Sequence, residues 1–462
     1  MTFSLAHCQM LKKREFIPRY LIRLVESLRA RLRDPAFVAR HRRRPQDFTR
    51  KRVLTFDLVM LLILQKSVKS IQRHLNEFLA RLADGGAVAP VTANAWPQAR
   101  AKLQPSAFVE LNRECLLPVA YGPERKAQCQ LWHGHRLMGF DSALAWLPYS
   151  EAMAQHFRVV EPQNQHGLSG GRYCEGRLSV VYDLLNRLGL DGQLVSGSVG
   201  EVALAIDQLA HVQPNDVVLS DSGFTGYVYL ASIRYRREAH FVARCSAGSF
   251  YPAQELFRQN RAGRSVVTRI FAPKDQRAQL RAQGLPLEMV VRFVSLRLPD
   301  GTLEVLVTSL LDEAAYPTGE FKALFHWRWG QETFHLMLKS RLDLENWSGN
   351  SPEAAQQDFA AALFLCNLET LLSQPAQEAL DQRSAHTQHP QQVNRAVSYH
   401  ALKTQVLDLL ASDEPAEQVI LQLQRWFMGE PVKVCPERKV PRRKFSAVRS
   451  YRFQRCKRKV VF

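Results

Sequence analysis

One segment of the 462-residue chain carries acidic and basic side chains at helical spacing. It reads FHWRWGQETFHLMLK from residue 325 to residue 339. At about 100° per residue, five hydrogen-bonding side chains share one stripe that is about 100° wide: Arg328, Gln331, Glu332, His335 and Lys339. Nearly all other positions are aromatic or aliphatic. The pattern therefore predicts a helix over 325–339 that is mostly buried, with one polar stripe facing a cleft.

The acid on this stripe has two interpretations. A carboxylate held in a buried place without a partner is costly, so Glu332 needs a cation. Arg328 lies four residues earlier and can supply that cation in a purely structural ion pair. Alternatively, Glu332 binds a metal ion while Arg328 and Lys339 face phosphates, because an acid between two bases suits a metal site on a nucleic-acid backbone. The sequence leaves both interpretations open.

Two aspartates occupy positions where folds commonly present catalytic groups. Asp141 follows the apolar run 137–140, and Asp221 follows a short buried strand expected at 217–219. Strand ends and the turns after them often carry function, although an aspartate there is also a common turn former. Together with Glu332 they supply three oxygen ligands that suit Mg²⁺ or Mn²⁺. Two such ions about 4 Å apart can activate the attacking oxygen and stabilise the leaving oxygen in phosphodiester displacement.

The elements that must position these residues alternate between strands and helices, which indicates an α/β fold. Strands are expected at 137–140 and 143–147, a hairpin at 179–185 and 188–195, and further strands at 217–219 and 240–245. Helices are expected at 201–211 and 227–235. Glu201 begins the first of these helices and is either a first-turn acid or an accessory acid near the site. Strand-like runs at 265–272, 287–296 and 302–311 form a β-rich block before the 325–339 helix.

The two ends of the chain are expected to be largely helical, with basic arms. Short helices at 56–65, 70–82 and 93–103 suit a helix-turn-helix-like DNA-binding region, although a plain helical cap on the next domain fits as well. After residue 340, Ser351 is expected to cap a helix that reaches residue 372. A polar, exposed loop is expected at 374–400, and a last amphipathic helix at 416–428.

The charge of the chain is concentrated near its ends. The net charge is +19, and residues 12–52 hold 15 Lys/Arg against 4 Asp/Glu, while residues 433–459 hold 12 against one. Two basic arms that flank a near-neutral body favour nucleic acid as a partner over an anionic membrane. Arginine-rich ends that only maintain solubility are the alternative. The candidate DNA contacts in the arms are Arg42, Arg43, Arg44, Arg442, Arg443 and Lys444.

Composition excludes several classes of protein. A hydrophobic content of 46% with 23% charged residues is ordinary for a globular protein. No apolar run approaches the ~20 residues of a membrane helix, and the first residues do not resemble a signal peptide. The eight cysteines are scattered without a CxxC pair, so we expect reduced thiols in a cytoplasmic protein with no membrane partner.

The spacing Arg328-x3-Glu332-x6-Lys339 resembles the Tyr-Arg-Glu-Lys signature of cut-and-paste insertion-sequence transposases with a DDE active site. The contexts "LMGFDS" around Asp141 and "VVLSDSGF" around Asp221 are similar to that family as well. So are the β-rich block before the helix and the Arg/Lys-rich tail. Phe325 stands where the signature has tyrosine, which removes a hydroxyl and keeps an aromatic face.

The resemblance implies a ribonuclease H-like catalytic core with a β-rich insertion before the glutamate-bearing helix, plus a helical N-terminal DNA-binding region. It implies that Asp141, Asp221 and Glu332 are the catalytic ligands of two Mg²⁺ (or Mn²⁺) ions. The candidate DNA contacts on and beside the helix are Phe325, Arg328, His335 and Lys339. The expected division of the chain is 1–125 (basic arm and helices), 126–245 (core), 246–315 (insertion), 316–375 (core with the catalytic helix) and 376–462 (loop, helix and basic tail).

The activity implied by the resemblance is metal-dependent cleavage at transposon ends, followed by strand transfer. The freed 3′-hydroxyl attacks target double-stranded DNA within a synaptic homodimer, in the cytoplasm of a prokaryote at the nucleoid. All seven tryptophans lie outside 246–315, so a hairpin step, for which relatives use a tryptophan of that block, stays open. The alternatives are a nuclease on the same fold and a catalytically silent DNA-binding protein derived from a transposase. Convergence of the three carboxylates is the observation that separates an enzyme from the silent protein.

Overall fold

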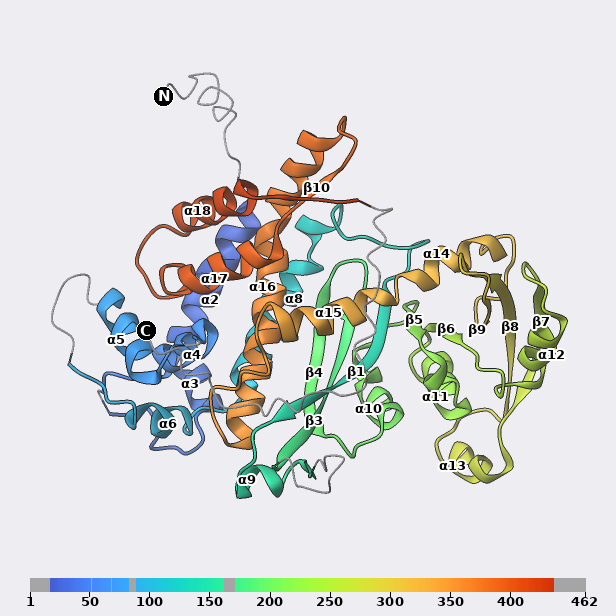
Figure 1. The fold of residues 1–462 in the computed structure, drawn as a ribbon, viewed down its shortest axis with the longest axis horizontal. Helices are drawn as coiled ribbons and strands as arrows, with labels where there is room; N and C mark the ends of the chain where they lie inside the picture. Colours follow the sequence, from blue (N-terminus) through green and yellow to red (C-terminus); the bar gives the residue numbers. More distant parts are fainter. Residues whose placement is uncertain (1–16, 51, 68, 83–88, 162–170, 436–462) are drawn as a thin grey trace.

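The computed structural model describes residues 17–50, 52–67, 69–82, 89–161 and 171–435. Its centre is one nine-stranded sheet with helices on both faces (Figure 1). The neighbouring strands are, in order, β2 (Arg158–Val160), β3 (Tyr173–Asp183), β1 (Leu137–Leu147), β5 (Val217–Ser220), β6 (His240–Arg244), β9 (Leu303–Thr308), β8 (Glu288–Arg297) and β7 (Ser265–Phe271), with β4 (Leu188–Ser196) paired to β3.

The direction of the strands changes across the sheet. β1 is antiparallel to β3, and β3 to β4, whereas β1, β5 and β6 run parallel to one another. β5 reads Val-Val-Leu-Ser and is buried at every residue, as expected of a central parallel strand covered on both faces. The predicted hairpin is present, with longer strands than expected and a four-residue connection at 184–187.

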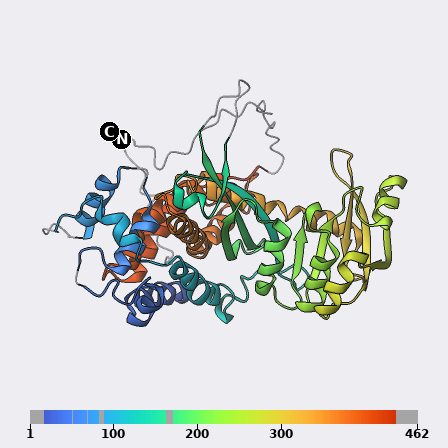
Figure 2. The same ribbon diagram turned by 90° about the horizontal axis from the view of Figure 1, so that it is seen from below.

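The predicted β-rich block does not form a sheet of its own. Its three predicted strands are present as β7, β8 and β9, and β9 hydrogen-bonds antiparallel to β6. The block therefore extends the central sheet. The views in Figure 1 and Figure 2 place these strands at one end of an elongated molecule and the N-terminal helices at the other.

Two sets of helices cover the two faces of the sheet. One face is covered by α10 (Glu201–Gln208), α11 (Tyr227–Ala231), α12 (Tyr251–Gln259) and α13 (Arg277–Ala282). The other face carries α14 (Phe321–His326) and α15 (Trp329–Ser340), whose buried residues pack with those of β1, β5 and β6. The predicted helix at 325–339 is thus divided between α14 and α15, with helical backbone angles at Trp327 and Arg328 between them.

The long helix α16 (Pro352–Ser384) packs against both the sheet and the N-terminal helices. Ser351 caps it as predicted, by accepting from the backbone N–H of Ala354. The prediction of an exposed loop at 374–400 is wrong. α16 continues through Pro375, because Ala376 and Leu380 add a buried face at helical spacing. After a short connection, α17 (Arg395–Leu410) follows, and α18 (Ala416–Gly429) is the predicted last helix.

The described part of the first basic arm is largely a folded helical pair, which was not predicted from the sequence. α2 (Arg19–Arg33) and α3 (Pro35–His41) bury their apolar sides. The guanidinium of Arg29 donates to the carbonyl oxygens of Asp408, Leu409 and Glu414 at 2.7–2.9 Å, so it caps the end of α17. The arginines between the leucines hid this amphipathic helix.

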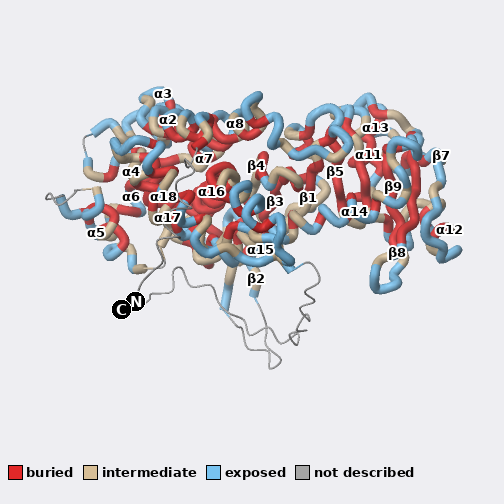
Figure 3. Tube along the Cα trace, turned by 90° about the horizontal axis from the view of Figure 1, so that it is seen from above, coloured by how far each residue is buried: buried red, intermediate tan, exposed pale blue. Residues whose placement is uncertain are grey.

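The helices predicted for the rest of the N-terminal region are present as α4 (Phe56–Gln65), α5 (Ile71–Leu82) and α6 (Ala95–Arg100), followed by α7 (Ser106–Leu111), η2 (Asn112–Leu116) and α8 (Leu117–Ala120). A continuous buried region runs under them and along α16 (Figure 3). None of the helices that the structure describes combines the length and the hydrophobicity needed to cross a membrane.

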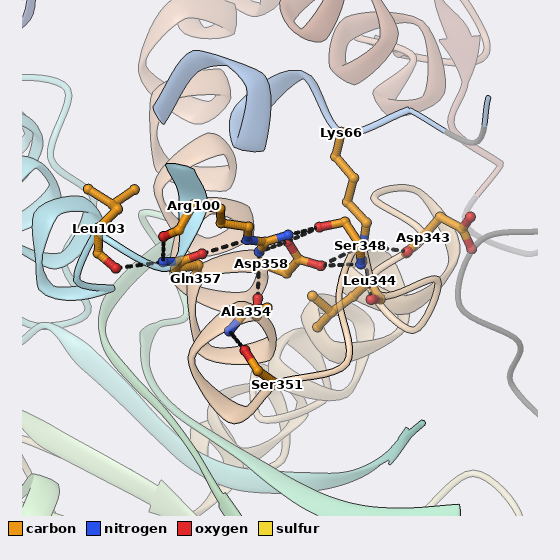
Figure 4. A network of polar contacts seen from close by, with 10 residues as sticks. All are labelled: Lys66, Arg100, Leu103, Asp343, Leu344, Ser348, Ser351, Ala354, Gln357 and Asp358. Carbon is orange, nitrogen blue, oxygen red and sulfur yellow. Dashed lines mark hydrogen bonds and ion pairs between the residues drawn. The ribbon is translucent and has the colours of Figure 1, made fainter. Parts of the chain in front are cut away.

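A buried ionic network fixes the N-terminal helices to α16 (Figure 4). The Nη2 atom of Arg100 lies 2.7 Å from Oδ1 of the fully buried Asp358 and also donates to the carbonyl of Ala354. Lys66 donates to the carbonyls of Asp343 and Leu344, just after α15, at 3.1 and 3.0 Å. Burial raises the pKa of Asp358, but Arg100 and Lys66 outweigh burial and hold this pKa below its usual value.

Candidate active site

Three charged residues form a row across the parallel part of the sheet. The register of β1 with β5, and of β5 with β6, makes Asp141, Asp221 and Arg244 level with one another just beyond the last paired residues of β5. Alternation along the strands directs their side chains to the face that carries α15. Asp221 follows its strand as predicted, whereas Asp141 lies in the middle of β1 and not at a strand end.

Glu332 reaches this row from the first turn of α15. The Nη1 atom of Arg328 lies 2.9 Å from Oε1 of Glu332 and 3.8 Å from Oδ2 of Asp221. The Arg328 side chain is only 7% exposed, and its guanidinium also lies over the rings of Phe325 and Trp329. The structure therefore brings two of the three predicted carboxylates together around one nitrogen atom.

The position of α15 depends on a close approach to β1. Gln331, buried beside Glu332, donates from Nε2 to the carbonyl of Val180 at 2.7 Å and to that of Asp141 at 3.4 Å. A Cβ atom at Gly139 would lie only 2.3 Å from Oε1 of Gln331. Glycine at this strand position thus allows the helix, and Glu332 with it, to settle onto the row of acids.

The environment of Asp141 favours its neutral form. Burial raises the pKa of this carboxyl to about 6, and the charges of Glu201 and Glu332 act in the same direction. The backbone N–H of Ser142, which donates to Oδ1 at 2.8 Å, and the charge of Arg328 oppose the shift. Asp141 is therefore close enough to Glu332 and Arg328 to be influenced electrostatically by both.

Glu201 lies beside the row, as one of its two predicted interpretations requires. Its Oε1 atom accepts from the hydroxyl of Ser142 at 2.6 Å and pairs with Arg177. Arg177 also donates to the Ser142 hydroxyl at 2.7 Å. A fourth acid is thus hydrogen-bonded to Ser142, the residue next to Asp141.

Sequence analysis missed two charged residues of the site, Arg244 and Glu304. The Nη2 atom of Arg244 lies 2.5 Å from Oδ1 of Asp221, and its Nη1 atom lies 3.7 Å from Oε1 of Glu304. Glu304 is buried on β9, and burial raises its pKa despite the opposing charges of Arg244 and Arg328. The only sequence signal is that Arg244 lies next to the end of the strand predicted at 240–245, because the approach of Glu304 depends on the pairing of β6 with β9.

The predicted DNA contacts on the helix are less accessible than expected. Phe325 and Arg328 are buried, and so is His335, whose ring lies against the backbone of Asp141 and whose pKa burial lowers to about 4. His335 therefore faces the sheet, and its role as a DNA contact stays a prediction. Lys339 is partly exposed, donates to the carbonyl of Leu144 and lies 3.4 Å from Glu345.

The helix is also not buried on nearly all sides, contrary to the prediction. Its polar stripe faces the sheet, where the acids and the carbonyl oxygens of β1 and β3 serve as partners. Trp327, Trp329 and Leu336 point away and are 41–65% exposed. The periodicity of the sequence predicted the angle between the polar and apolar sides of the helix. It did not predict which side would face the core.

The predicted basic contacts lie at two places along the chain. Arg42, Arg43 and Arg44 follow α3, and the last two are exposed. Arg43 lies 3.3 Å from Glu353 at the start of α16. The predicted contacts Arg442, Arg443 and Lys444 lie outside the described residues.

The donor atoms at the site fit a hard divalent cation, because they are carboxylate oxygens only. Within the described part of the chain, however, no group of three or more His, Cys, Asp or Glu side chains lies close enough to hold a metal ion. Asp221 and Glu332 instead share the guanidinium of Arg328. The guanidinium of Arg328 therefore supplies positive charge to both carboxylates.

Comparison with known proteins identifies a related family. Residues 154–368 match the family model described as the transposase DDE domain. The match includes Asp221 and Glu332 and begins after Asp141. Among solved structures, a cryo-EM structure of the piggyBac transposase synaptic complex with hairpin DNA is 12% identical in sequence, with a TM-score of 0.38, over 89% of this chain and 86% of that one. A search of curated proteins found no match.

Proposed function

Because residues 154–368 match the family model described as the transposase DDE domain, we propose that the chain is the DNA transposase of an insertion sequence. It cleaves DNA at the transposon ends and joins the freed ends to target DNA. The observation that carries this proposal is the convergence of Asp221 and Glu332 on one cationic group, with Asp141 level with Asp221 on the next strand.

The strand order supports a ribonuclease H-like core. β4, β3 and β1 form an antiparallel group, and β5 and β6 continue it in parallel with β1. In this proposal residues 126–245 and 316–375 form the catalytic core, and 246–315 form the insertion. Residues 1–125 and 376–462 supply the remaining contacts to DNA.

Asp141, Asp221 and Glu332 are the residues that would hold the metal ions. Mg²⁺ or Mn²⁺, bound as a pair, supplies activation of the attacking oxygen and stabilisation of the leaving oxygen. The two aspartates hold their positions because they lie on adjacent strands of a buried sheet, and Glu332 is held by the docking of α15. Arg328 lies between Asp221 and Glu332, and its guanidinium would contact a phosphate if a bound cation neutralised these carboxylates.

The proposed partner is double-stranded DNA, bound by a homodimer that pairs two transposon ends in the cytoplasm. The net charge of +19 favours a polyanion. The exposed side chains of Arg43 and Arg44 and the partly exposed Lys339 are candidate phosphate contacts on the described surface. Since α2 and α4 pack on α16–α18, the role of the N-terminal helices in DNA binding is a proposal alongside their structural role.

The variant Glu332→Ala tests the proposal. Purified protein with Mg²⁺ and the DNA that flanks its own gene is expected to nick the repeat ends and to join them to a target plasmid. Glu332→Ala is expected to lose both reactions and to keep its affinity for end DNA. Glu288→Ala, which removes an exposed acid from β8, is the matched control and retains both. Undiminished cleavage by Glu332→Ala contradicts the proposal.

One observation favours a second candidate, a catalytically silent DNA-binding protein. The carboxylates already have a cation in Arg328, and the described residues contain no cluster of three metal-ligating side chains. In the same assay a silent protein binds end DNA without nicking it. A nuclease on the same fold nicks the DNA and does not join it to the target.

A further inference from the structure

Asp221 carries an arginine on each of its two carboxylate oxygens. Arg244 lies 2.5 Å from Oδ1, and Arg328 lies 3.8 Å from Oδ2. The two arginines differ in accessibility. The Arg328 side chain is 7% exposed and is held by Glu332, whereas the Arg244 side chain is 36% exposed. Only Arg244 therefore has a large solvent-facing surface at this carboxylate.

The other end of the Arg244 guanidinium faces Glu304, with Nη1 of Arg244 3.7 Å from the carboxylate oxygen. Glu304 lies on β9, which is hydrogen-bonded on both sides, to β6 and to β8. The Glu304 side chain is only 10% exposed. Because Glu304 is fixed, it can retain Arg244 beside the site when Arg244 leaves Asp221.

We propose that Arg244 exchanges partners during the reaction, pairing with Asp221 in the free protein and with a DNA phosphate when Asp221 takes up a divalent cation. Glu304 is the positioning residue that keeps Arg244 at the site in both states. The inference rests on the proposed function, since it requires Asp221 to be a metal ligand. It adds two residues, both outside the predicted signature, and assigns one strand of the insertion, β9, a positioning role at the active site.

The physical basis is competition for one carboxylate. The guanidinium of Arg244, 2.5 Å from Oδ1, already compensates the charge of Asp221, so Arg244 lowers the affinity of Asp221 for cations while no DNA is present. Removing Arg244 frees Asp221. Neutralising Glu304 lowers the affinity of Asp221 for cations. Arg244 then has only Asp221 as a partner, and the negative charge near the site is smaller.

The test is a calorimetric titration of the full chain with Mn²⁺ alone, without DNA. Arg244→Ala is expected to bind Mn²⁺ about two- to fivefold more tightly than the wild type, the range of a partly exposed ion pair. Glu304→Gln is expected to bind it more weakly. Arg269→Ala, which removes an exposed arginine from β7 of the same insertion, is the matched control and is expected to leave Mn²⁺ binding unchanged.

A second measurement tests whether Arg244 contacts a DNA phosphate. Binding of a fluorescent duplex oligonucleotide, measured across a range of salt concentrations in the presence of Mn²⁺, is expected to lose about one unit of salt slope in Arg244→Ala. Arg244→Lys is expected to restore most of this slope, because it keeps the charge. Arg269→Ala again serves as the control.

The outcomes separate this inference from the proposed function. If Arg244→Ala binds Mn²⁺ equally or less tightly, if Glu304→Gln changes affinity in the same direction as Arg244→Ala, or if the salt slope is unchanged, the exchange of partners is wrong. The proposed function survives each of these results as long as Asp221→Asn abolishes Mn²⁺ binding. A wild-type protein that binds no Mn²⁺ overturns both.

Discussion

Asp141 would bind a metal in its ionised form, and that form lowers the stability of the fold. Burial raises its pKa to about 6 from an ordinary value of 3.8, so the folded chain holds this proton more tightly than the unfolded chain does. Stability therefore falls as the pH rises through the window between these two values, and it stays lower above pH 6. The ionised Asp141 that would bind a metal is thus a destabilising group in the metal-free protein.

We expect Asp141→Asn to stabilise the protein at pH 8 by about 1–3 kcal/mol, because asparagine carries no charge to bury and still accepts from Ser142. Urea unfolding in the presence of EDTA measures this difference, which is expected to vanish near pH 4, where the wild-type carboxyl is protonated. A variant that is less stable than the wild type at pH 8 would show that Asp141 is well solvated. Asp381→Asn, an exposed change on α16, is the control.

At the residue scale, the sequence predicted the groups whose spacing is local. Arg328 and Glu332 are four residues apart on a helix and pair as one interpretation required. Asp221 follows a buried strand that its own composition reveals. Arg244 and Glu304 were missed because their contact depends on strands 60 residues apart, and no local pattern records which strands become neighbours.

Among the secondary-structure elements, α15 has the most exacting position, because Gln331 touches the backbone of β1 at a glycine. We expect Gly139→Ala to displace α15, to destabilise the fold by about 1–3 kcal/mol as overpacking does, and to reduce DNA cleavage. Removing the clash with the double change Gly139→Ala/Gln331→Ala is expected to recover part of the lost stability.

Gly226→Ala is the matched control for this experiment, since nothing lies within 4 Å of the Cβ atom it would add and its φ is −61°. Thermal unfolding and a cleavage assay on the same preparations provide the measurements. If Gly139→Ala behaves like the control, the close approach of α15 to β1 is not what positions Glu332.

Element prediction succeeded where the hydrophobic pattern was strong and failed where polar residues obscured it. The strands of the insertion and the helices from 56 to 100 are close to their predicted places. α2 was hidden by arginines that alternate with buried leucines, and the second half of α16 by glutamines around a short apolar face. In both helices the long polar side chains are good helix formers, so polarity alone was a poor guide to loops.

For the molecule as a whole, the buried network around Asp358 ties the N-terminal helices to α16, which packs against the sheet. We expect Asp358→Ala to cost about 3–5 kcal/mol, because Arg100 and Lys66 would remain buried without their counter-charge. Chemical denaturation measures this cost, and Asp381→Ala on the exposed side of the same helix is the control. A loss below about 1 kcal/mol would mean that water or other groups replace Asp358.

The sequence predicted two basic arms around a near-neutral body, and the structure modifies that picture. The described part of the first arm is mainly α2 and α3, and two of its arginines, Arg29 and Arg33, bond to the chain at the end of α17 and just after it. Charge composition records how many cations there are. It does not show which of these cations bond to other parts of the protein, because such bonds join residues that are hundreds of positions apart in the chain.

The direct pairing of β9 with β6 has a consequence for any attempt to shorten this protein. Trimming the insertion at its sequence boundaries would strip β6 of its neighbour and leave a row of open backbone donors and acceptors on a hydrophobic strand, the kind of edge that recruits other chains and precipitates. A minimal version that keeps β9, and with it Glu304, would leave that edge closed.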